Sequence, residues 1–263
     1  MKQKFSSVFI TGASSGLGRA LALALSTKGT TLFLTGRNEK RLKEVATLCA
    51  KKGGAVHTFI FDVRDREKAK EALKKAMKIC PLDLVIINAG VSLAMAKDQD
   101  SKTPLYTLFD TNVGGVVNTS IPALSLLLNQ GHGHLCFISS MAGFRGLPSC
   151  PAYAASKNFV RAWAEGLSAA VPKEVHISCV CPGFIKTPLT DKNTFKMPGL
   201  MSAKKAADII IKKLSKGRRL ITFPWFLAFF TGLASMIPSS LILPILARLP
   251  KKAEEIDVLH RPF

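Results

Sequence analysis

Short apolar runs alternate along the chain with longer stretches in which apolar positions recur at helical spacing. The apolar runs predict seven strands: Val8–Thr11, Thr31–Thr35, Val56–Asp62, Leu84–Asn88, His134–Ser139, His176–Cys181 and Leu220–Phe223. Several runs are apolar throughout rather than at every second position. This is typical of strands that are covered by helices on both faces.

The stretches between these runs predict helices over Leu17–Lys28, Lys40–Lys51, Arg66–Lys78, Leu105–Asn129, Ala152–Ala170 and Ala203–Leu214. The strand–helix alternation predicts an α/β fold with a doubly wound, parallel, seven-stranded sheet. Such a sheet binds its ligand at the carboxyl ends of the strands, where the strand order reverses. Because no linker or repeat interrupts the 263 residues, we expect one catalytic domain over residues 1–219 and an extension over 220–263 that begins with the last strand.

A glycine-rich turn follows the first predicted strand. It has the sequence Thr11-Gly12-Ala13-Ser14-Ser15-Gly16-Leu17-Gly18 and leads into the first helix. Glycines at such a turn allow the backbone to approach a pyrophosphate at the helix N-terminus, although a glycine turn can also be purely structural. The G-x-x-x-G-x-G spacing resembles that of the short-chain dehydrogenase/reductase family. The resemblance covers about residues 5–190.

A tyrosine and a lysine stand four residues apart in Tyr153-Ala154-Ala155-Ser156-Lys157, on one face of a predicted helix. A nearby cation favours the phenolate and draws the tyrosine pKa from about 10 towards the neutral range. Ser140 lies thirteen residues upstream of the tyrosine, just after the fifth strand, and Ser139 beside it is the alternative. Asn112 lies within the longest predicted helix.

The family resemblance assigns roles to these residues. Tyr153 would exchange a proton with the substrate, and Ser140 would hydrogen-bond the reacting oxygen. Lys157 would lower the tyrosine pKa and hold the nicotinamide ribose, and the backbone carbonyl of Asn112 would hold a water of the proton relay. The resemblance therefore implies an oxidoreductase that interconverts a ketone or aldehyde and an alcohol.

The end of the second strand carries the signal for cofactor choice. An acidic residue there would bind the ribose 2′-hydroxyl of NAD, whereas an arginine accommodates the 2′-phosphate of NADP. The strand ends Thr35-Gly36-Arg37, so Arg37 predicts NADP(H). The family motifs imply further cofactor contacts at Asp62 and Val63, at Asn88, Ala89 and Gly90, at Pro182 and Gly183, and at Thr187.

The loop 188–201 is where family members form their substrate pocket, and here it is apolar. Candidate lining residues are Phe184, Ile185, Leu189, Phe195, Met197, Leu200 and Met201, together with Val91, Leu93, Met95 and Phe144. They predict a hydrophobic small-molecule substrate. A polar metabolite remains the alternative, and a non-catalytic, cofactor-binding scaffold is a third hypothesis.

Composition narrows the classes of partner. The chain holds 37 Lys and Arg against 17 Asp and Glu, a net charge of +20. It lacks a nucleic-acid reader motif or a basic stripe, so we expect no nucleic acid and consider either a generally basic surface or attraction to an anionic membrane. The six cysteines and five histidines lack metal-ligand spacing, so we expect no metal.

The extension is free of charge from Leu220 to Ala247. Its length permits a membrane span, but its prolines favour two short helices, Trp225–Ile237 and Ser239–Leu249. Basic residues flank both, which suits peripheral membrane contact through residues 225–252, as in the apolar C-terminal segments of membrane-associated relatives such as hydroxysteroid dehydrogenases and ketosphinganine reductases. Burial and a true span stay open.

Two expectations concern the whole molecule. The first strand begins close to Met1, so no signal peptide is predicted and we expect a cytoplasmic protein, peripheral on the cytoplasmic membrane face if the extension contacts lipid. The family resemblance implies a homodimer or homotetramer formed through the two long central helices.

Overall fold

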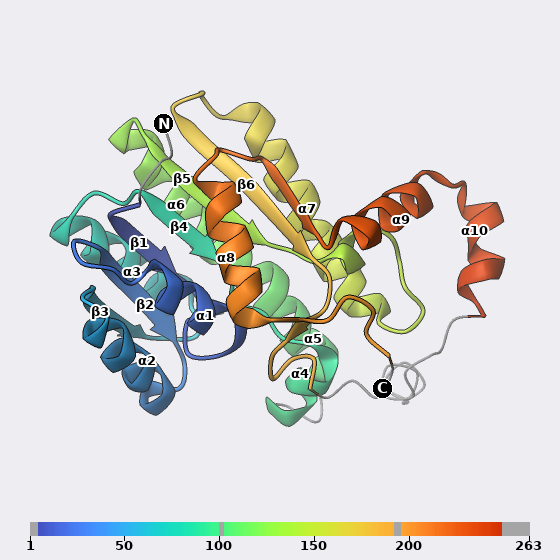
Figure 1. Ribbon diagram of the computed structural model, residues 1–263, viewed down its shortest axis with the longest axis horizontal. Coiled ribbons are helices and arrows are strands. Elements are labelled where there is room, and N and C mark those ends of the chain that lie inside the picture. The colour runs from blue at the N-terminus through green and yellow to red at the C-terminus, as the bar shows by residue number, and fades with distance from the viewer. Residues whose placement is uncertain (1–4, 100–102, 192–195, 249–263) are drawn as a thin grey trace.

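The computed structural model describes residues 5–99, 103–191 and 196–248. Its centre is a parallel sheet with the strand order β3-β2-β1-β4-β5-β6-β9 (Figure 1). The strands are β1 (Ser7–Ile10), β2 (Thr31–Gly36), β3 (Ala55–Ile60), β4 (Leu84–Ile87), β5 (Gly133–Ile138), β6 (Val175–Pro182) and β9 (Leu220–Phe223). The predicted doubly wound, seven-stranded sheet is confirmed, and each predicted strand lies within two residues of its observed bounds.

Helices cover both faces of this sheet. The helices α1 (Gly16–Leu25), α2 (Glu39–Lys51) and α8 (Ala203–Leu214) pack on one face, and α3 (Arg66–Ile79), α6 (Gly115–Gln130) and α7 (Pro151–Ala170) pack on the other. A short ladder between β7 (Ile185–Lys186) and β8 (Met201–Ser202) ties down the ends of the loop after β6.

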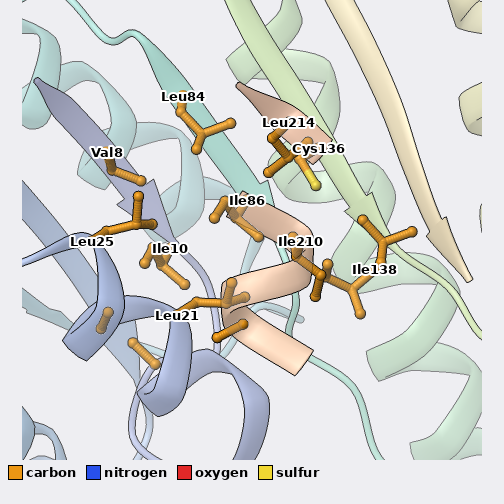
Figure 2. Close-up of a cluster of buried hydrophobic side chains, with 14 of the residues drawn as sticks. Val8, Ile10, Leu21, Leu25, Leu84, Ile86, Cys136, Ile138, Ile210 and Leu214 are labelled. Carbon is orange, nitrogen blue, oxygen red and sulfur yellow. The ribbon is translucent and has the colours of Figure 1, made fainter. Parts of the chain in front are cut away.

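The core is two apolar layers separated by the sheet. Val8 and Ile10 of β1 point into the layer beneath α1 and α8 (Figure 2). Phe9 between them belongs to the opposite layer. Burying side chains of this size stabilises the fold by about 1.5–3 kcal/mol each relative to exposure. Continuous apolar runs therefore become strands here because both of their faces are covered.

The longest predicted helix is not continuous. The structure divides Leu105–Asn129 into α5 (Pro104–Phe109), a π-helical turn η1 (Asp110–Gly114) and α6. Apolar periodicity does not reveal a π turn, because a turn with one extra residue has the same kinds of residues as a turn of α-helix. The prediction of one regular helix was wrong at this point, and the wider turn carries Asn112.

The C-terminal extension follows the predicted pattern. After β9, helix α9 (Trp225–Met236) and helix α10 (Ser239–Leu246) project from the domain beside the 3₁₀ turn η2 (Met141–Phe144) (Figure 1). No side chain of α9 is buried, and Ile242 is the buried residue of α10. Position 249, the predicted end of the second helix, lies outside the described residues. Helix α4 (Leu93–Gln99) was not predicted.

One helical stretch among the described residues, Pro104–Gln130, is long and apolar enough to cross a membrane by length and composition alone. It comprises α5, η1 and α6, and its α6 part packs against α3 and strands β4 and β5 of the sheet. A core helix of this fold passes the same test. Helix α9 belongs to the shorter apolar helices.

A buried histidine lies on β5. The His134 side chain is 0% exposed, with Nε2 2.7 Å from Ser178 Oγ and with its ring edge-on to Phe5. Burial, together with the nearby His176, lowers the pKa of His134 to about 3. The imidazole is therefore neutral in the folded protein across the neutral and mildly acidic range.

We predict that this histidine makes the fold sensitive to acid. Between pH 6.5 and about 3 the unfolded chain binds a proton that folded His134 does not, so stability is lost as the pH falls. The slope is up to about 1.4 kcal/mol per pH unit. Chemical denaturation of wild type and His134→Gln at pH 7, 6 and 5 should show the wild type losing stability faster. Parallel curves would contradict this account.

Candidate active site and cofactor pocket

A pocket of about 510 Å³ opens at the carboxyl ends of the strands, where β1 and β4 lie side by side and the strand order reverses. Its lining includes all the predicted cofactor residues: Gly12, Ser14, Ser15, Gly16, Leu17, Gly18, Arg37, Asp62, Val63, Asn88, Ala89, Gly90, Tyr153, Lys157, Pro182, Gly183 and Thr187. Ser140 also lines it, whereas Asn112 lies beneath the surface and is 0% exposed.

The glycine turn allows close packing between β1, α1 and β4. Gly12 has a φ of 67°, and a Cβ there would come within 2.9 Å of Ala89 Cα. A Cβ on Gly18 would collide with the Gly12 carbonyl and lie 2.5 Å from Asn88 Nδ2. Ser15 is the N-cap residue of helix α1, and its side chain makes no capping hydrogen bond; the first turn of the helix has no acidic residue. The N-terminus of α1 therefore suits a pyrophosphate.

Hydrogen bonds hold the ends of β1 and β4 together. Asn88 Nδ2 donates to the carbonyl oxygens of Thr11 at 2.9 Å and Gly12 at 3.2 Å. Thr11 Oγ1 accepts from the backbone N–H groups of Asn88 at 2.9 Å and Ala89 at 3.1 Å. The predicted Asn88 motif thus supports the glycine turn directly.

Two arginines converge on a carboxylate at the adenine end. Arg37 Nη1 lies 3.3 Å from Asp62 Oδ2 and donates to Gln99 Oε1 at 2.5 Å, and Arg64 Nη2 lies 2.8 Å from the same carboxylate. Burial alone would raise the pKa of Asp62, but hydrogen bonds from Arg64 and the charges of Arg37 and Arg64 hold it below its usual range. The carboxylate is therefore ionised at neutral pH.

Sequence reasoning missed a second cation at this end. Arg41 lines the pocket beside Arg37, on the first turn of α2. Its backbone N–H donates to Asn38 Oδ1 at 2.9 Å, so Asn38 caps the helix that carries it. Its position in the sequence could have revealed it, because Arg41 follows Arg37 by four residues and the helix that carries it begins between the two.

Lys157 is the most deeply buried cation of the site. It is 5% exposed, its Nζ donates to the Ile138 carbonyl oxygen at 3.0 Å, and Nζ lies 5.8 Å from the centre of the Tyr153 ring. Burial lowers the pKa of Lys157 to about 8. The ammonium is thus held close to the phenol ring.

The pKa of Tyr153 differs from the expectation. Its apolar surroundings raise the pKa above the ordinary value, the neighbouring Cys150 adds to the rise, and Ser140 opposes it. The expected net lowering of the Tyr153 pKa is not seen in this structure, because desolvation of the phenol is the largest effect on it.

The two serines have different partners. Ser139 Oγ donates to the Lys157 carbonyl oxygen at 2.7 Å, which uses its proton inside the fold. Ser140 interacts with the Tyr153 phenol and caps η2 by accepting from the Ala142 N–H at 3.1 Å. The arrangement thus favours Ser140 over Ser139 as the residue that faces a substrate.

Asn112 links three elements beneath the pocket. Its Oδ1 accepts from Val91 N at 2.8 Å, and its Nδ2 donates to the Val91 carbonyl at 2.9 Å and to Ser156 Oγ at 3.1 Å. A Cβ on Gly90 would lie 3.2 Å from Asn112 Oδ1 and 3.3 Å from Lys157 Nζ, so this glycine separates the two. The π turn thus places the amide between β4 and α7.

The structure divides the predicted substrate residues into two groups. Val91, Met95, Ile185 and Leu189 line the pocket, and Pro188 and Thr190 join them from the same loop. Leu93 is instead buried in a small cluster with Val91, and Phe144 packs against the core layer of α7. Phe184, Met197, Leu200 and Met201 do not line the pocket, and position 195 lies outside the described residues.

The described residues contain no group of three or more His, Cys, Asp or Glu side chains that could hold a metal ion. Cys179 and Cys181 share one face of β6, and their sulfurs are 3.7 Å apart.

Comparison with known proteins decides the family. The family described as short chain dehydrogenase matches residues 6–197. The chain belongs to this family of oxidoreductases. An uncharacterized oxidoreductase of Myxococcus xanthus is 34% identical over 242 residues, covering 91% of this chain and 96% of the relative. Estradiol 17-beta-dehydrogenase 11 of Mus musculus is 26% identical over 254 residues, covering 95% of this chain and 85% of the relative.

Solved structures share the fold of this short-chain dehydrogenase. One from Burkholderia cenocepacia in complex with NADP has a TM-score of 0.78 at 22% identity and covers 95% of this chain and 100% of its own. Another from Burkholderia phymatum in complex with NAD has a TM-score of 0.75 at 23% identity and covers 100% of this chain and 98% of its own. Neighbours of this fold therefore bind either dinucleotide.

We predict that Gly18→Ala weakens dinucleotide binding at least about tenfold, because the added methyl would push the glycine turn away from β4. Gly166→Ala in α7 is the matched control, since a Cβ there meets nothing within 4 Å beyond the backbone of its own helix and its chain neighbours. It should leave binding unchanged and raise stability by up to about 1 kcal/mol. Fluorescence titration with NADPH and thermal unfolding measure both effects. Equal affinities of the two variants would contradict the close approach.

Proposed function

We propose that this chain is an NADPH-dependent oxidoreductase that reduces a ketone or aldehyde on a hydrophobic, lipid-like molecule. The proposal rests on one observation above all. A phenol, a buried ammonium and a serine hydroxyl, from Tyr153, Lys157 and Ser140, meet at one end of a dinucleotide-sized pocket. Such a set can bind a carbonyl oxygen and give it a proton.

The pocket fits a dinucleotide by its chemistry. Bound there, NADPH would supply a hydride to the substrate carbon. Ser140 Oγ–H would hydrogen-bond the carbonyl oxygen, and the Tyr153 hydroxyl would donate its proton to the oxygen as negative charge develops. Lys157 stabilises the resulting phenolate by its charge, and Asn112 holds Val91 and Ser156 so that β4 and α7 keep their spacing.

The raised pKa of Tyr153 keeps the phenol protonated at neutral pH. A reductase needs a protonated phenol when its substrate binds, and a phenol enclosed in apolar surroundings keeps its proton at neutral pH. Lys157, with a pKa of about 8, remains mostly charged at pH 7 and can therefore stabilise the phenolate after proton transfer.

Preference for NADPH is supported by the charge at the adenine end. Arg37 and Arg41 both line the pocket where β2 ends, and Gly36 stands at the position of an acidic residue in NAD-preferring relatives. The approach of Arg37 to Asp62 does not exclude this role, because Asp62 also accepts from Arg64 and stays compensated when Arg37 turns away.

We predict that Arg37→Ala reduces the preference for NADPH over NADH by about tenfold or more, because it removes a charge-assisted contact to the 2′-phosphate. Lys40→Ala, which removes an exposed cation three residues further along, on the first turn of α2 and outside the pocket lining, is the matched control and should leave the preference unchanged. Steady-state kinetics with both cofactors measure the ratio. An unchanged ratio in Arg37→Ala would refute the cofactor assignment.

The substrate class is inferred from the pocket wall. Val91, Met95, Ile185 and Leu189 give the substrate side an apolar surface, which suits a long-chain ketone or sterol rather than a polar metabolite. The mouse relative named for estradiol adds support by analogy. A substrate that partitions from lipid in turn suits an enzyme positioned on the cytoplasmic face of a membrane.

We also propose association into a homodimer or homotetramer through α6 and α7. Ile121 and Leu128 of α6 are exposed, and they border a shallow apolar groove with Trp163 and Leu167 of α7. Such a face on two adjacent long helices suits a symmetric contact with a second copy.

We predict that Tyr153→Phe lowers turnover by about 10² or more, because the proton donor is lost while the ring and its packing stay. NADPH binding, measured by fluorescence, should remain close to that of wild type. Oxidation of NADPH with long-chain ketones and short polar ketones, compared side by side, tests the substrate class. Turnover retained in the variant would refute the mechanism, and faster turnover of polar ketones would refute the apolar substrate.

A further inference from the structure

The outer face of α9 is an uninterrupted apolar surface. Trp225, Phe229, Leu233 and Met236 recur at helical spacing and are 80%, 62%, 52% and 81% exposed, and Phe230 lies beside them at 64%. Helix α10 continues the exposed apolar surface with Leu241, Leu243 and Ile245. We call these eight residues the apolar face. Patches of this kind on soluble proteins mark interaction sites.

The helix pair contacts the domain on its other side. Ile242 of α10 is 5% exposed, and Leu227 of α9 lies against Gly183 and Gly199. Arg145 joins the two helices to the domain, because its guanidinium donates to the Ser235 carbonyl oxygen at 3.4 Å and to Ser239 Oγ at 3.3 Å. The apolar face is therefore on the side of the helix pair that points away from the domain.

The contacts of the helix pair belong to the catalytic region. Arg145 directly follows η2, whose first residue follows Ser140, and η2 packs against both α7 and α9. Gly183, which lines the pocket, would touch Pro224 and Leu227 through an added Cβ. The apolar face thus lies beside the substrate end of the pocket, at the same edge of the sheet.

The edge of the sheet from which α9 projects carries several exposed lysines. Lys186 pairs in β7 with Ser202, which caps α8, so Lys204 and Lys205 on the first turn of α8 lie at the same edge. These three lysines and Lys196 in the loop between are exposed, as is Asp191, the acidic residue of that loop. Arg248 follows α10 and is exposed as well.

Part of the basic flank that the sequence suggested is elsewhere. Arg218 and Arg219 precede β9, and that strand runs parallel to β6 towards the pocket edge, so both arginines stand at the opposite edge of the sheet. The exposed lysines of the loop after β6 and of α8 stand at the edge of the sheet from which α9 projects, and Gly199 of that loop lies against Phe226 of α9.

We propose that the apolar face docks on an anionic lipid bilayer, with the lysines of the pocket edge on lipid phosphates and the substrate end of the pocket facing the lipid. The proposal rests on the proposed function, since it names the surface from which a hydrophobic substrate enters. Exposed Trp and Phe side chains beside lysines suit the interface between headgroups and acyl chains.

Charge also argues for lipid over a second copy as the occupant. Joining two such edges would place their exposed lysines close together, where like charges repel each other. An anionic bilayer instead attracts each lysine near its surface.

Tryptophan fluorescence tests the insertion directly. The chain has two tryptophans, so Trp163→Phe leaves Trp225 as the single reporter. With vesicles of equal parts phosphatidylcholine and phosphatidylglycerol, its emission should shift to the blue and be quenched by lipids brominated on their acyl chains. Vesicles of phosphatidylcholine alone, or high salt, should weaken both changes. Absence of quenching in the anionic vesicles would overturn the proposal.

A pair of double variants tests the location of the surface. Phe229→Glu with Leu233→Glu should lower vesicle sedimentation about tenfold or more. Leu48→Glu with Ile79→Glu makes the same change in charge at exposed apolar positions of α2 and α3, and should retain binding. An equal loss of vesicle sedimentation in both double variants would show that net charge alone causes the effect, and would overturn the proposal.

Activity measurements separate this inference from the proposed function. The α9 pair should reduce a short, soluble ketone at the wild-type rate but lose turnover of a long-chain ketone carried in vesicles. Reduction of both by wild type without vesicle binding would overturn the docking and leave the reductase intact. A change in oligomeric size of the α9 pair without lipid, measured by light scattering, would assign the face to a second copy and also overturn it.

Discussion

The pocket depends on how closely the carboxyl ends of β1 and β4 approach each other. The side-chain amide of Asn88 binds the carbonyls of Thr11 and Gly12, and Thr11 Oγ1 accepts two backbone N–H groups in return. Gly18 packs so tightly against this junction that a methyl group would collide with it. Because the two strands are joined in this way, the N-terminus of α1 points towards the site where the strand order reverses, between β1 and β4.

At the other end of the pocket, burial destabilises the charged forms of Lys157 and Tyr153, and their hydrogen bonds offset only part of this effect. Lys157 has lost its water and retains a carbonyl partner at Ile138, which explains the fall of its pKa to about 8. Tyr153 is desolvated as well, so its pKa rises. Both groups are destabilised in their charged forms. Such a pair responds strongly to any charge that enters the pocket, which is the property of a proton-transfer site.

The extension shows how one element can serve two environments. Its inner side provides Leu227, Ile242 and the partners of Arg145, which fasten it to η2 and to the end of β6. On its outer side, the large apolar side chains of α9 are exposed. Sequence composition alone describes both sides equally as apolar. Only the packed structure separates the residues that support the pocket from those that face outwards.

Much of the architecture followed from local pattern. Seven apolar runs became seven strands, and those in the middle of the sheet are covered on both faces. The glycine turn, Arg37 and the Tyr153–Lys157 pair fell near strand or helix ends, where this topology gathers ligands. The tertiary structure decided the rest. The π turn at Asn112, the second cation Arg41, the inversion of the Tyr153 pKa shift and the lysines at the edge from which α9 projects all depend on contacts between distant segments. Desolvation and spatial adjacency are properties of the packed chain, and no local pattern carries them.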